Sequence, residues 1–266
     1  MKKPVLVILL VVLLGIFCFS GYQIYAYISD GIRSNEQYDQ LADLVNQNTH
    51  PTETTPPSPT EDPAPQPESS QPTDPTSIEE YQAVYNLNSD TVGWIRIEGT
   101  KINYPVMQTP DNPDFYLKRD FNKEKSDWGA IYVREQCDVN KPSDNVTIYG
   151  HCMRDGSMFA QLHEYRDKTF WEEHKLIYFD TLEEYHVYEI FGVFVTSANV
   201  GEGFSYHQMV DAKDEGDFDN FISNIRKLSL YDTGIVPKYG DKVICLSTCE
   251  YSMDNGRLVV AARRVF

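Results

Sequence analysis

Two residues near the end of the chain combine a nucleophile with a cation. Cys249 lies near the end of an apolar run that begins at Val243, and Arg257 opens a second apolar run just after Asn255-Gly256. Two β-rich runs separated by Asn-Gly are typical of a β-hairpin, which would bring Arg257 back beside Cys249. A guanidinium can lower the pKa of a neighbouring thiol and can bind a carbonyl oxygen as it becomes negative. The pattern indicates a cysteine nucleophile with an electrostatic partner, although a buried Cys and a surface Arg on an ordinary hairpin fit the same residues.

A histidine earlier in the chain supplies the proton-transfer group that such a nucleophile needs. His151 follows a β-rich run over residues 145–149 and stands next to Gly150, and imidazole titrates closest to neutral pH among the side chains. Cys152 is a weaker nucleophile candidate, because nothing near it in the sequence supplies a separate base and oxyanion donor. Four other histidines lie in helical, alternating or loop contexts and are predicted to be structural: His163, His174, His186 and His207.

The cysteines do not predict a disulfide framework or a metal site. Cys18 lies in an N-terminal apolar run. Cys245 and Cys249 would be about 13 Å apart on one strand, too far for a disulfide. Neither this pair nor the neighbours His151 and Cys152 match the spacing of a compact zinc knuckle. We therefore expect no metal and no cofactor.

The composition argues against a nucleic-acid-binding protein. The 266 residues include 23 Lys and Arg against 40 Asp and Glu, which gives a net charge of −17. Phosphate binding needs a basic face, so we expect no nucleic-acid partner.

The N-terminus is predicted to be a membrane anchor. Lys2 and Lys3 precede an apolar stretch over residues 5–28, which is long enough for one helix to cross about 30 Å of hydrocarbon. The lysines favour a cytoplasmic N-terminus and an extracellular remainder. No small-x-small cleavage site follows Phe19, so an uncleaved signal-anchor over residues 1–29 is favoured over a cleaved signal peptide.

Residues 30–77 connect this anchor to the globular part. Residues 30–50 have a weak helical pattern, and nine of the 26 residues in 51–76 are Pro, with no Lys or Arg. This composition cannot bury a core and predicts an extended stalk, which at about 3.1 Å per residue would reach roughly 80 Å. The globular domain is placed at residues 78–266.

The globular part is predicted to be mainly β. Short apolar runs separated by turns are typical of a barrel or a sandwich, and eight of them occur, over residues 92–97, 101–106, 129–133, 145–149, 176–179, 185–195, 242–248 and 257–265. Helices are predicted over 78–85, 158–174 and 216–230. The last is expected to lie on the barrel through apolar residues at helical spacing, namely Phe218, Phe221, Ile222, Ile225 and Leu228.

Three segments of the chain together resemble the sortases, cysteine transpeptidases of Gram-positive cell surfaces, and in particular class B. Residues 91–108 are similar to the family's opening strands, and residues 149–159 (YGHCMRDGSMF) to its histidine segment. Residues 246–250 (LSTCE) with Arg257 resemble its T-L-x-T-C strand and the arginine after it. The resemblance covers most of residues 78–266. It implies a closed eight-stranded sortase-type β-barrel with peripheral helices, including the long one near 216–230.

The resemblance also implies roles for individual residues. Cys249 would be the nucleophile, His151 the general acid/base, and Arg257 the group that positions the scissile carbonyl or its oxyanion. Positions that contact the sorting peptide in class B relatives are matched by Leu117, Ser247 and Glu250. The implied reaction cleaves the C-terminal sorting motif of surface proteins through a thioester. The acyl group then passes to an amine of a peptidoglycan precursor or, in pilus assembly, to a pilin lysine.

Two positions depart from the family pattern, and two readings from other classes remain. Cys245 stands where the family usually has Thr, and Cys152 where a polar residue is common. Strand alternation puts Cys245 on the face of Ser247 and Cys249, so we expect it to line the same groove.

A stalked, non-enzymatic binding module on the same barrel is the alternative from another class. A papain-like hydrolase is disfavoured, because there the cysteine precedes the histidine and here His151 precedes Cys249.

Overall fold

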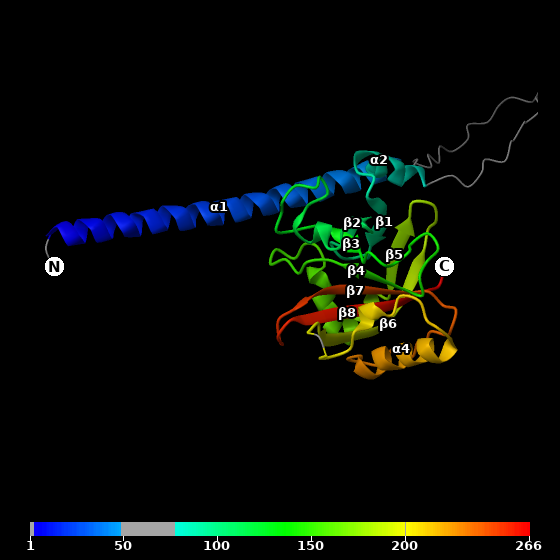
Figure 1. Cartoon of the computed structure of the whole chain (residues 1–266). Coiled ribbons are helices and arrows are strands. Elements are labelled where there is room, and N and C mark those ends of the chain that lie inside the picture. Colours follow the sequence, from blue (N-terminus) through cyan, green and yellow to red (C-terminus); the bar gives the residue numbers. More distant parts are fainter. Residues whose placement is uncertain (1–2, 49–77, 200) are drawn as a thin grey trace, which may run out of the picture.

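A closed barrel of eight strands forms the centre of the computed structural model, which describes residues 3–48, 78–199 and 201–266 (Figure 1). The strands follow one another around the barrel in the order β1-β2-β3-β4-β7-β8-β6-β5. Their bounds are β1 Thr91–Arg96, β2 Asn103–Met107, β3 Ile131–Val133, β4 Asn145–Tyr149, β5 Leu176–Thr181, β6 Val187–Ser197, β7 Val243–Glu250 and β8 Gly256–Arg264. The predicted closed eight-stranded barrel is confirmed.

Strand directions bring three chain segments to one end of the barrel. Two of the eight neighbouring pairs are parallel, β2 with β3 and β4 with β7. The parallel pairing puts the ends of β4 and β7 side by side, and β8 starts at that same end because it pairs antiparallel with β7. The hairpin turn uses Asn255, with φ of 49°, and the register pairs Cys249 with Arg257 as predicted.

Residues of β7 alternate between two hydrophobic clusters. Ile244 and Leu246 belong to the cluster that fills the barrel, whereas Val243 and Cys245 belong to a second cluster on its outer wall. Helix α4 (Glu215–Leu228) covers this second cluster with four buried residues, Phe218, Phe221, Ile222 and Ile225. Leu228 from the predicted apolar face is 41% exposed. The long helix near 216–230 is thus present and packs on the barrel as expected.

The region predicted as one helix over 158–174 is divided in two. A 3₁₀ helix, η2 (Ala160–Arg166), precedes the short helix α3 (Lys168–Glu173). Between them Asp167 is extended, and its side chain accepts a hydrogen bond from the Thr169 N–H. Because an N-cap residue has non-helical backbone angles, Asp167 cannot continue η2 while it caps α3. Other short helices are α2 (Glu79–Leu87), η1 (Phe115–Lys118) and η3 (Tyr206–Gln208).

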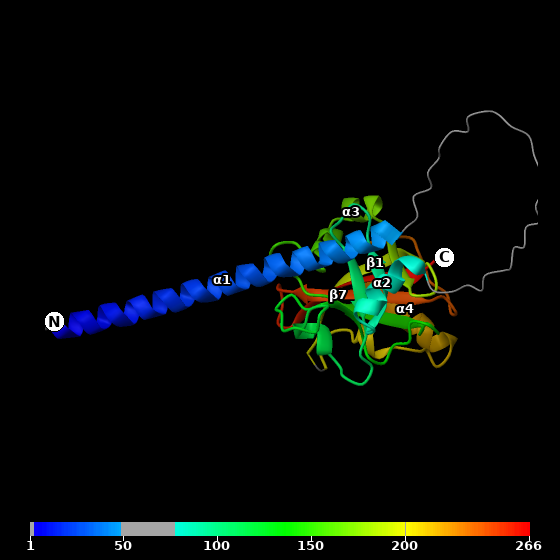
Figure 2. The ribbon, with the colours of Figure 1, turned by 90° about the horizontal axis from the view of Figure 1, so that it is seen from above.

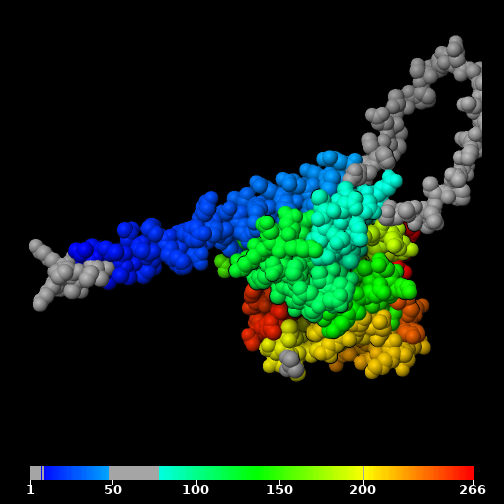
Figure 3. All heavy atoms as spheres, turned by 45° about the horizontal axis from the view of Figure 1, so that its top comes forward, coloured from blue at the N-terminus to red at the C-terminus, as the bar shows by residue number. Residues whose placement is uncertain are grey.

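Helix α1 (Lys3–Asn48) has two distinct parts (Figures 1 and 2). The N-terminal part projects beyond the barrel with exposed apolar side chains, and α1 contains a stretch long and apolar enough to cross a membrane. The C-terminal part lies across the barrel (Figure 3). Its side chains Tyr38, Leu41 and Val45 are buried there. Residues 30–48, expected to link anchor and domain, therefore share the barrel's core. The predicted stalk over 51–76 lies outside the described residues.

The N-terminal part of α1 and the β7–β8 turn extend toward the same side of the barrel (Figure 1). Tyr27 of α1 contacts the barrel domain, since its ring lies 4.9 Å from that of Trp128. Trp128 in turn donates to Ser157, shortly after the end of β4. The end of the barrel where β4 and β7 terminate is thus the end that faces the apolar part of α1.

Candidate active site

A pocket of about 290 Å³ lies on the outer wall of the barrel where β4, β7 and β8 meet. It brings together all three residues predicted to be catalytic, His151, Cys249 and Arg257. Leu117 and Ser247, predicted to contact the substrate, also line it. A larger pocket of about 390 Å³ lies between α1, α2 and β1, but it holds neither a cysteine nor a histidine.

Two neighbouring elements, β8 and η2, fix the backbone position of Cys249. Cys249 lies one residue before the end of β7, next to Arg257 on β8. Its backbone carbonyl accepts a hydrogen bond from Nε2 of His163 at 3.0 Å, which ties the strand end to η2. Its thiol is partly exposed and has no hydrogen bond among the described residues. The sulfur is therefore free to meet a substrate.

His151 is oriented by a backbone carbonyl. Its Nε2 lies 2.6 Å from the carbonyl oxygen of Leu117 in η1. Because a carbonyl oxygen only accepts, Nε2 carries the proton, and Nδ1 is the nitrogen that can take up a further proton. Burial lowers the pKa of His151, and the charges of Lys118 and Arg257 lower it further, against the opposite effects of Leu117 and Asp127. The ring is thus kept in the neutral form that can act as a base.

Arg257 presents the cation at the start of β8. Its Nη1 donates to the carbonyl oxygens of Gly256 at 2.9 Å and Asn255 at 3.3 Å, which fixes the guanidinium against the turn. Its other N–H groups have no hydrogen-bond partner among the described residues. They can bind an oxygen that becomes negative at the pocket.

Several polar residues of the pocket wall were not predicted from the sequence. The Tyr206 hydroxyl lies 2.6 Å from Oγ of Ser247, and burial raises the pKa of Tyr206 to about 12. Tyr149 is in register with Ser247 across the parallel pair, so strand alternation alone could have placed it on this face. Tyr206 and His207 belong to η3 in the long connection between β6 and β7, where no periodic pattern marks them.

Glu250 does not line the pocket. Its carboxylate lies 2.6 Å from Nη2 of Arg166, and it accepts hydrogen bonds from the backbone N–H and the hydroxyl of Ser252 at 3.0 and 2.7 Å. These contacts fasten the β7–β8 turn to η2. The predicted contact of Glu250 with the sorting peptide gains no support from this geometry.

The expectation that Cys245 lines the groove is wrong. Its side chain is fully buried in the cluster under α4, and burial raises its pKa. Alternation does put it on the face of Ser247 and Cys249, but α4 and its neighbouring segments cover that part of the face. Burial also raises the pKa of Cys152, which does not line the pocket. Neither thiol competes with Cys249 in this arrangement.

Comparison with known proteins identifies the family. A family model of the sortase domain matches residues 95–265. The chain belongs to the sortase family. It is 35% identical to sortase B of Listeria monocytogenes over 191 residues, which span 70% of this chain and 74% of that protein. Sortase B of Staphylococcus aureus is 30% identical over 186 residues, covering 69% and 74% of the two chains. The chain is accordingly a class B cysteine transpeptidase, and the non-enzymatic alternative is set aside.

Solved sortase B structures share the fold over nearly all of their length. The crystal structure of sortase B from Bacillus anthracis in complex with AAEK1 superposes with a TM-score of 0.69 at 29% identity, covering 90% of this chain and 99% of that one. A Staphylococcus aureus sortase B–substrate complex gives a TM-score of 0.73 at 24% identity, covering 89% and 98%. The second likeness shows the fold alone.

Proposed function

We propose that the enzyme cleaves the C-terminal sorting motif of surface proteins through a thioester at Cys249 and transfers the acyl group to an amine of a cell-wall precursor. The observation that carries this proposal is that one pocket is lined by the free thiol of Cys249, the neutral imidazole of His151 and the guanidinium of Arg257, which has N–H groups unpaired among the described residues. These are the groups that acyl transfer by a cysteine nucleophile requires. Class B membership supports the same reaction.

The first half-reaction forms the acyl-enzyme. The Cys249 thiol gives its proton to Nδ1 of His151 as the sulfur attacks the carbonyl carbon of the sorting motif. Arg257 binds the oxygen that becomes negative. The intermediate collapses when the amide nitrogen leaves and takes the proton from His151, which leaves a thioester and a free amine.

The second half-reaction releases the product. An incoming amine attacks the thioester carbon and gives a proton to His151. The Cys249 sulfur leaves and recovers a proton, so that a new amide bond replaces the thioester and the enzyme returns to its starting state. We propose that Leu117 and Ser247 contact the peptide, and their position in the lining of the pocket supports this.

The anchor sets where the reaction takes place. We propose that the apolar part of α1 crosses the membrane once with its N-terminus in the cytoplasm. The catalytic domain, residues 78–266, would then lie outside the cell. Residues 30–77 would be the juxtamembrane segment and Pro/Thr-rich stalk, of which residues 30–48 pack against the domain. The exposed apolar side chains of α1 between Val7 and Ile28 support this arrangement.

A ligation assay tests the proposal. The full chain in detergent micelles is incubated with a peptide library that carries Thr before the scissile bond, together with either an oligoglycine amine or a lysine-bearing pilin domain. We expect amine-dependent ligation that Cys249→Ala abolishes. Ligation to the pilin lysine in preference to the peptide amine would assign the enzyme to pilus assembly. If the wild type neither cleaves nor ligates any peptide, the proposal is wrong.

A further inference from the structure

We infer that helix α1 positions His151, so that the membrane anchor is part of the support of the active site. The inference rests on the proposed role of His151 in proton transfer. It concerns the folded segment over residues 115–130, which lies between α1 and the pocket. One side of this segment binds α1, and the other side holds the histidine.

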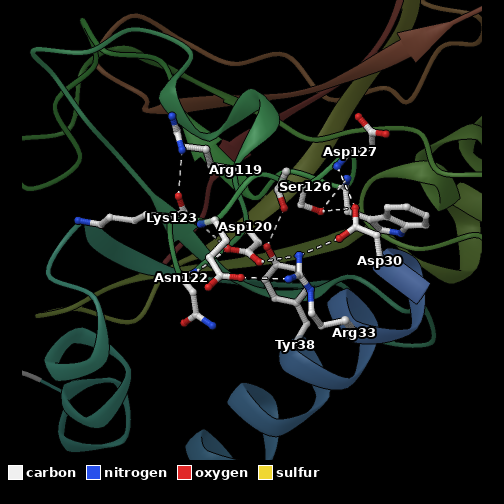
Figure 4. A network of polar contacts seen from close by, with 12 residues as sticks. Asp30, Arg33, Tyr38, Arg119, Asp120, Asn122, Lys123, Ser126 and Asp127 are labelled. Atoms are coloured by element: carbon white, nitrogen blue, oxygen red, sulfur yellow. Dashed lines mark hydrogen bonds and ion pairs between the residues drawn. The ribbon is translucent and has the colours of Figure 1, made fainter. Parts of the chain in front are cut away.

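The polar contacts of α1 with this segment are extensive (Figure 4). The Asp30 carboxylate accepts hydrogen bonds from the Ser126 hydroxyl at 3.0 Å and from the Asp127 backbone N–H at 3.1 Å. Arg33 lies 3.5 Å from the carboxylate of Asp120, whose side chain is only 4% exposed. The other oxygen of the Asp120 carboxylate accepts the backbone N–H groups of Asn122 and Glu124, both at 3.0 Å. Arg33 supplies the positive charge beside this buried carboxylate, so it joins α1 to the turn that Asp120 holds.

A buried hydrogen bond extends this contact toward the pocket. The hydroxyl of Tyr38 donates to the carbonyl oxygen of Gly129 at 2.9 Å. Gly129 has φ of 61°, and a Cβ there would lie 2.8 Å from the Leu117 carbonyl oxygen and 3.1 Å from Cδ2 of His151. The Gly129 backbone is thus packed against the histidine ring and against the carbonyl that binds it. Tyr38 therefore binds the same residue that packs against the His151 ring.

A second set of contacts joins α1 to the chain that follows His151. Gly31 allows the Trp128 indole to lie directly on the helix, since a Cβ at this position would be 2.5 Å from the ring. The indole N–H donates to the Ser157 hydroxyl at 3.1 Å. Asn35 donates to the Asp155 carboxylate at 3.1 Å, and the same carboxylate accepts from Ser157. Helix α1 thus supports the histidine segment through two sets of contacts, one at Gly129 and one at residues 155–157.

Through these contacts, the position of α1 affects the position and orientation of the His151 ring. The bond from Leu117 to His151 fixes the direction of Nδ1, and misplacement of a reacting group by about 1 Å can cost 100-fold in rate. If α1 shifts, the Gly129 backbone shifts with it, and His151 loses part of its orientation and burial. Tyr38, Arg33 and Asp30 are therefore positioning residues, which act on the reaction through the segment over residues 115–130.

The test uses single substitutions in the full chain in detergent micelles. Tyr38→Phe removes one hydroxyl, Arg33→Met removes the cation, and Arg33→Lys restores the charge. Glu36→Gln, on the exposed side of α1, is the surface control. Ile222→Ala on α4 is the stability control, because it removes buried volume far from residues 115–130. Each variant is characterised by its unfolding midpoint, by kcat and KM, by the pH profile of kcat/KM, and by NMR titration of the His151 ring.

We expect Tyr38→Phe and Arg33→Met to lower kcat about tenfold, with KM within about twofold of wild type, a change of about 1.4 kcal/mol in the barrier. The pKa of His151 should rise toward its ordinary value, because less complete burial relieves the largest cause of its depression. Arg33→Lys should recover most of kcat. Glu36→Gln should match wild type, and Ile222→Ala should lower the unfolding midpoint without moving the His151 titration.

The opposite pattern would overturn the inference. If Tyr38→Phe and Arg33→Met lower the unfolding midpoint but keep the wild-type kcat and His151 titration, α1 supports the fold only. Failure of the proposed function has a different signature, namely a wild-type enzyme that forms no product. In that case the NMR titration still decides whether α1 controls the environment of His151.

Discussion

Replacement of Glu250 by Gln tests whether this residue supports the β7–β8 turn or binds substrate. Its side chain is 6% exposed and holds both Arg166 and Ser252. In Glu250→Gln, one side-chain oxygen becomes an NH₂ group that faces a donor, and Arg166 loses its counter-charge. Hydrogen bonds to charged groups contribute about 1.5–3 kcal/mol each, so we expect a loss of about 2–3 kcal/mol in the free energy of unfolding.

Urea unfolding of the full chain in micelles measures this loss of stability. The values of kcat and KM for a sorting peptide show whether the substitution affects catalysis or substrate binding. We expect a lower kcat, because the turn joins the strand ends that carry Cys249 and Arg257, with KM within about twofold of wild type. Arg166→Met should have a similar effect on stability, and the double variant should be less destabilised than the sum of the two, because the residues act as a pair. A tenfold rise in KM with unchanged stability would refute this reasoning and make Glu250 a substrate-binding residue.

The same contribution has a defined pH dependence. Burial alone would raise the pKa of Glu250, but the hydrogen bonds from Ser252 and the charge of Arg166 outweigh it and lower the pKa. A carboxylate with a depressed pKa in the folded state stabilises the fold above its unfolded pKa of about 4.3, and this stabilisation disappears as the pH falls through the folded value. The stability difference between wild type and Glu250→Gln should therefore shrink in acid.

Three further predictions concern the histidine, the buried cysteine and the docked helix. The acid limb of kcat/KM should lie below about pH 6.5 because burial lowers the pKa of His151, and Lys118→Gln should move the limb upward; a downward shift would contradict the assigned charge effect. A thiol reagent should modify Cys249 in the native enzyme and Cys245 only after unfolding, as located by peptide mass mapping. Equal modification rates for the two thiols in the native enzyme would mean that α4 does not shield Cys245 from solvent. Leu41→Ala should cost about 2–5 kcal/mol in the free energy of unfolding, as expected for a buried Leu; a loss within about 0.5 kcal/mol would show that α1 does not stay docked.

The predictable part of the structure is the part that local patterns encode. Apolar runs and turn residues located the strands, and Asn-Gly predicted the hairpin that pairs Cys249 with Arg257. Alternation put Cys245 on the correct face of β7. Alternation does not report what covers a face, however, and the α4 cover that buries Cys245 depends on how a distant helix packs.

Contacts between distant segments were not predictable in the same way. The bond from His151 to Leu117 joins residues 34 positions apart, and Leu117 lies in a short 3₁₀ helix with no periodic signal. The docking of α1 was missed for a similar reason. Its buried face has few large apolar residues and is completed by polar contacts with Asp120 and Gly129, which only the tertiary structure supplies.

Intact-mass measurement of the acyl-enzyme shows directly whether Cys249 forms a thioester with the sorting peptide. The full chain is mixed with the sorting peptides and quenched in acid before an amine is added. We expect a mass increase equal to the acyl fragment, located at Cys249 by peptide mapping. Hydroxylamine should release it, as it releases a thioester, and Cys249→Ala should not show it. An adduct on Cys152 or Cys245, or peptide cleavage that persists in Cys249→Ala, would contradict it.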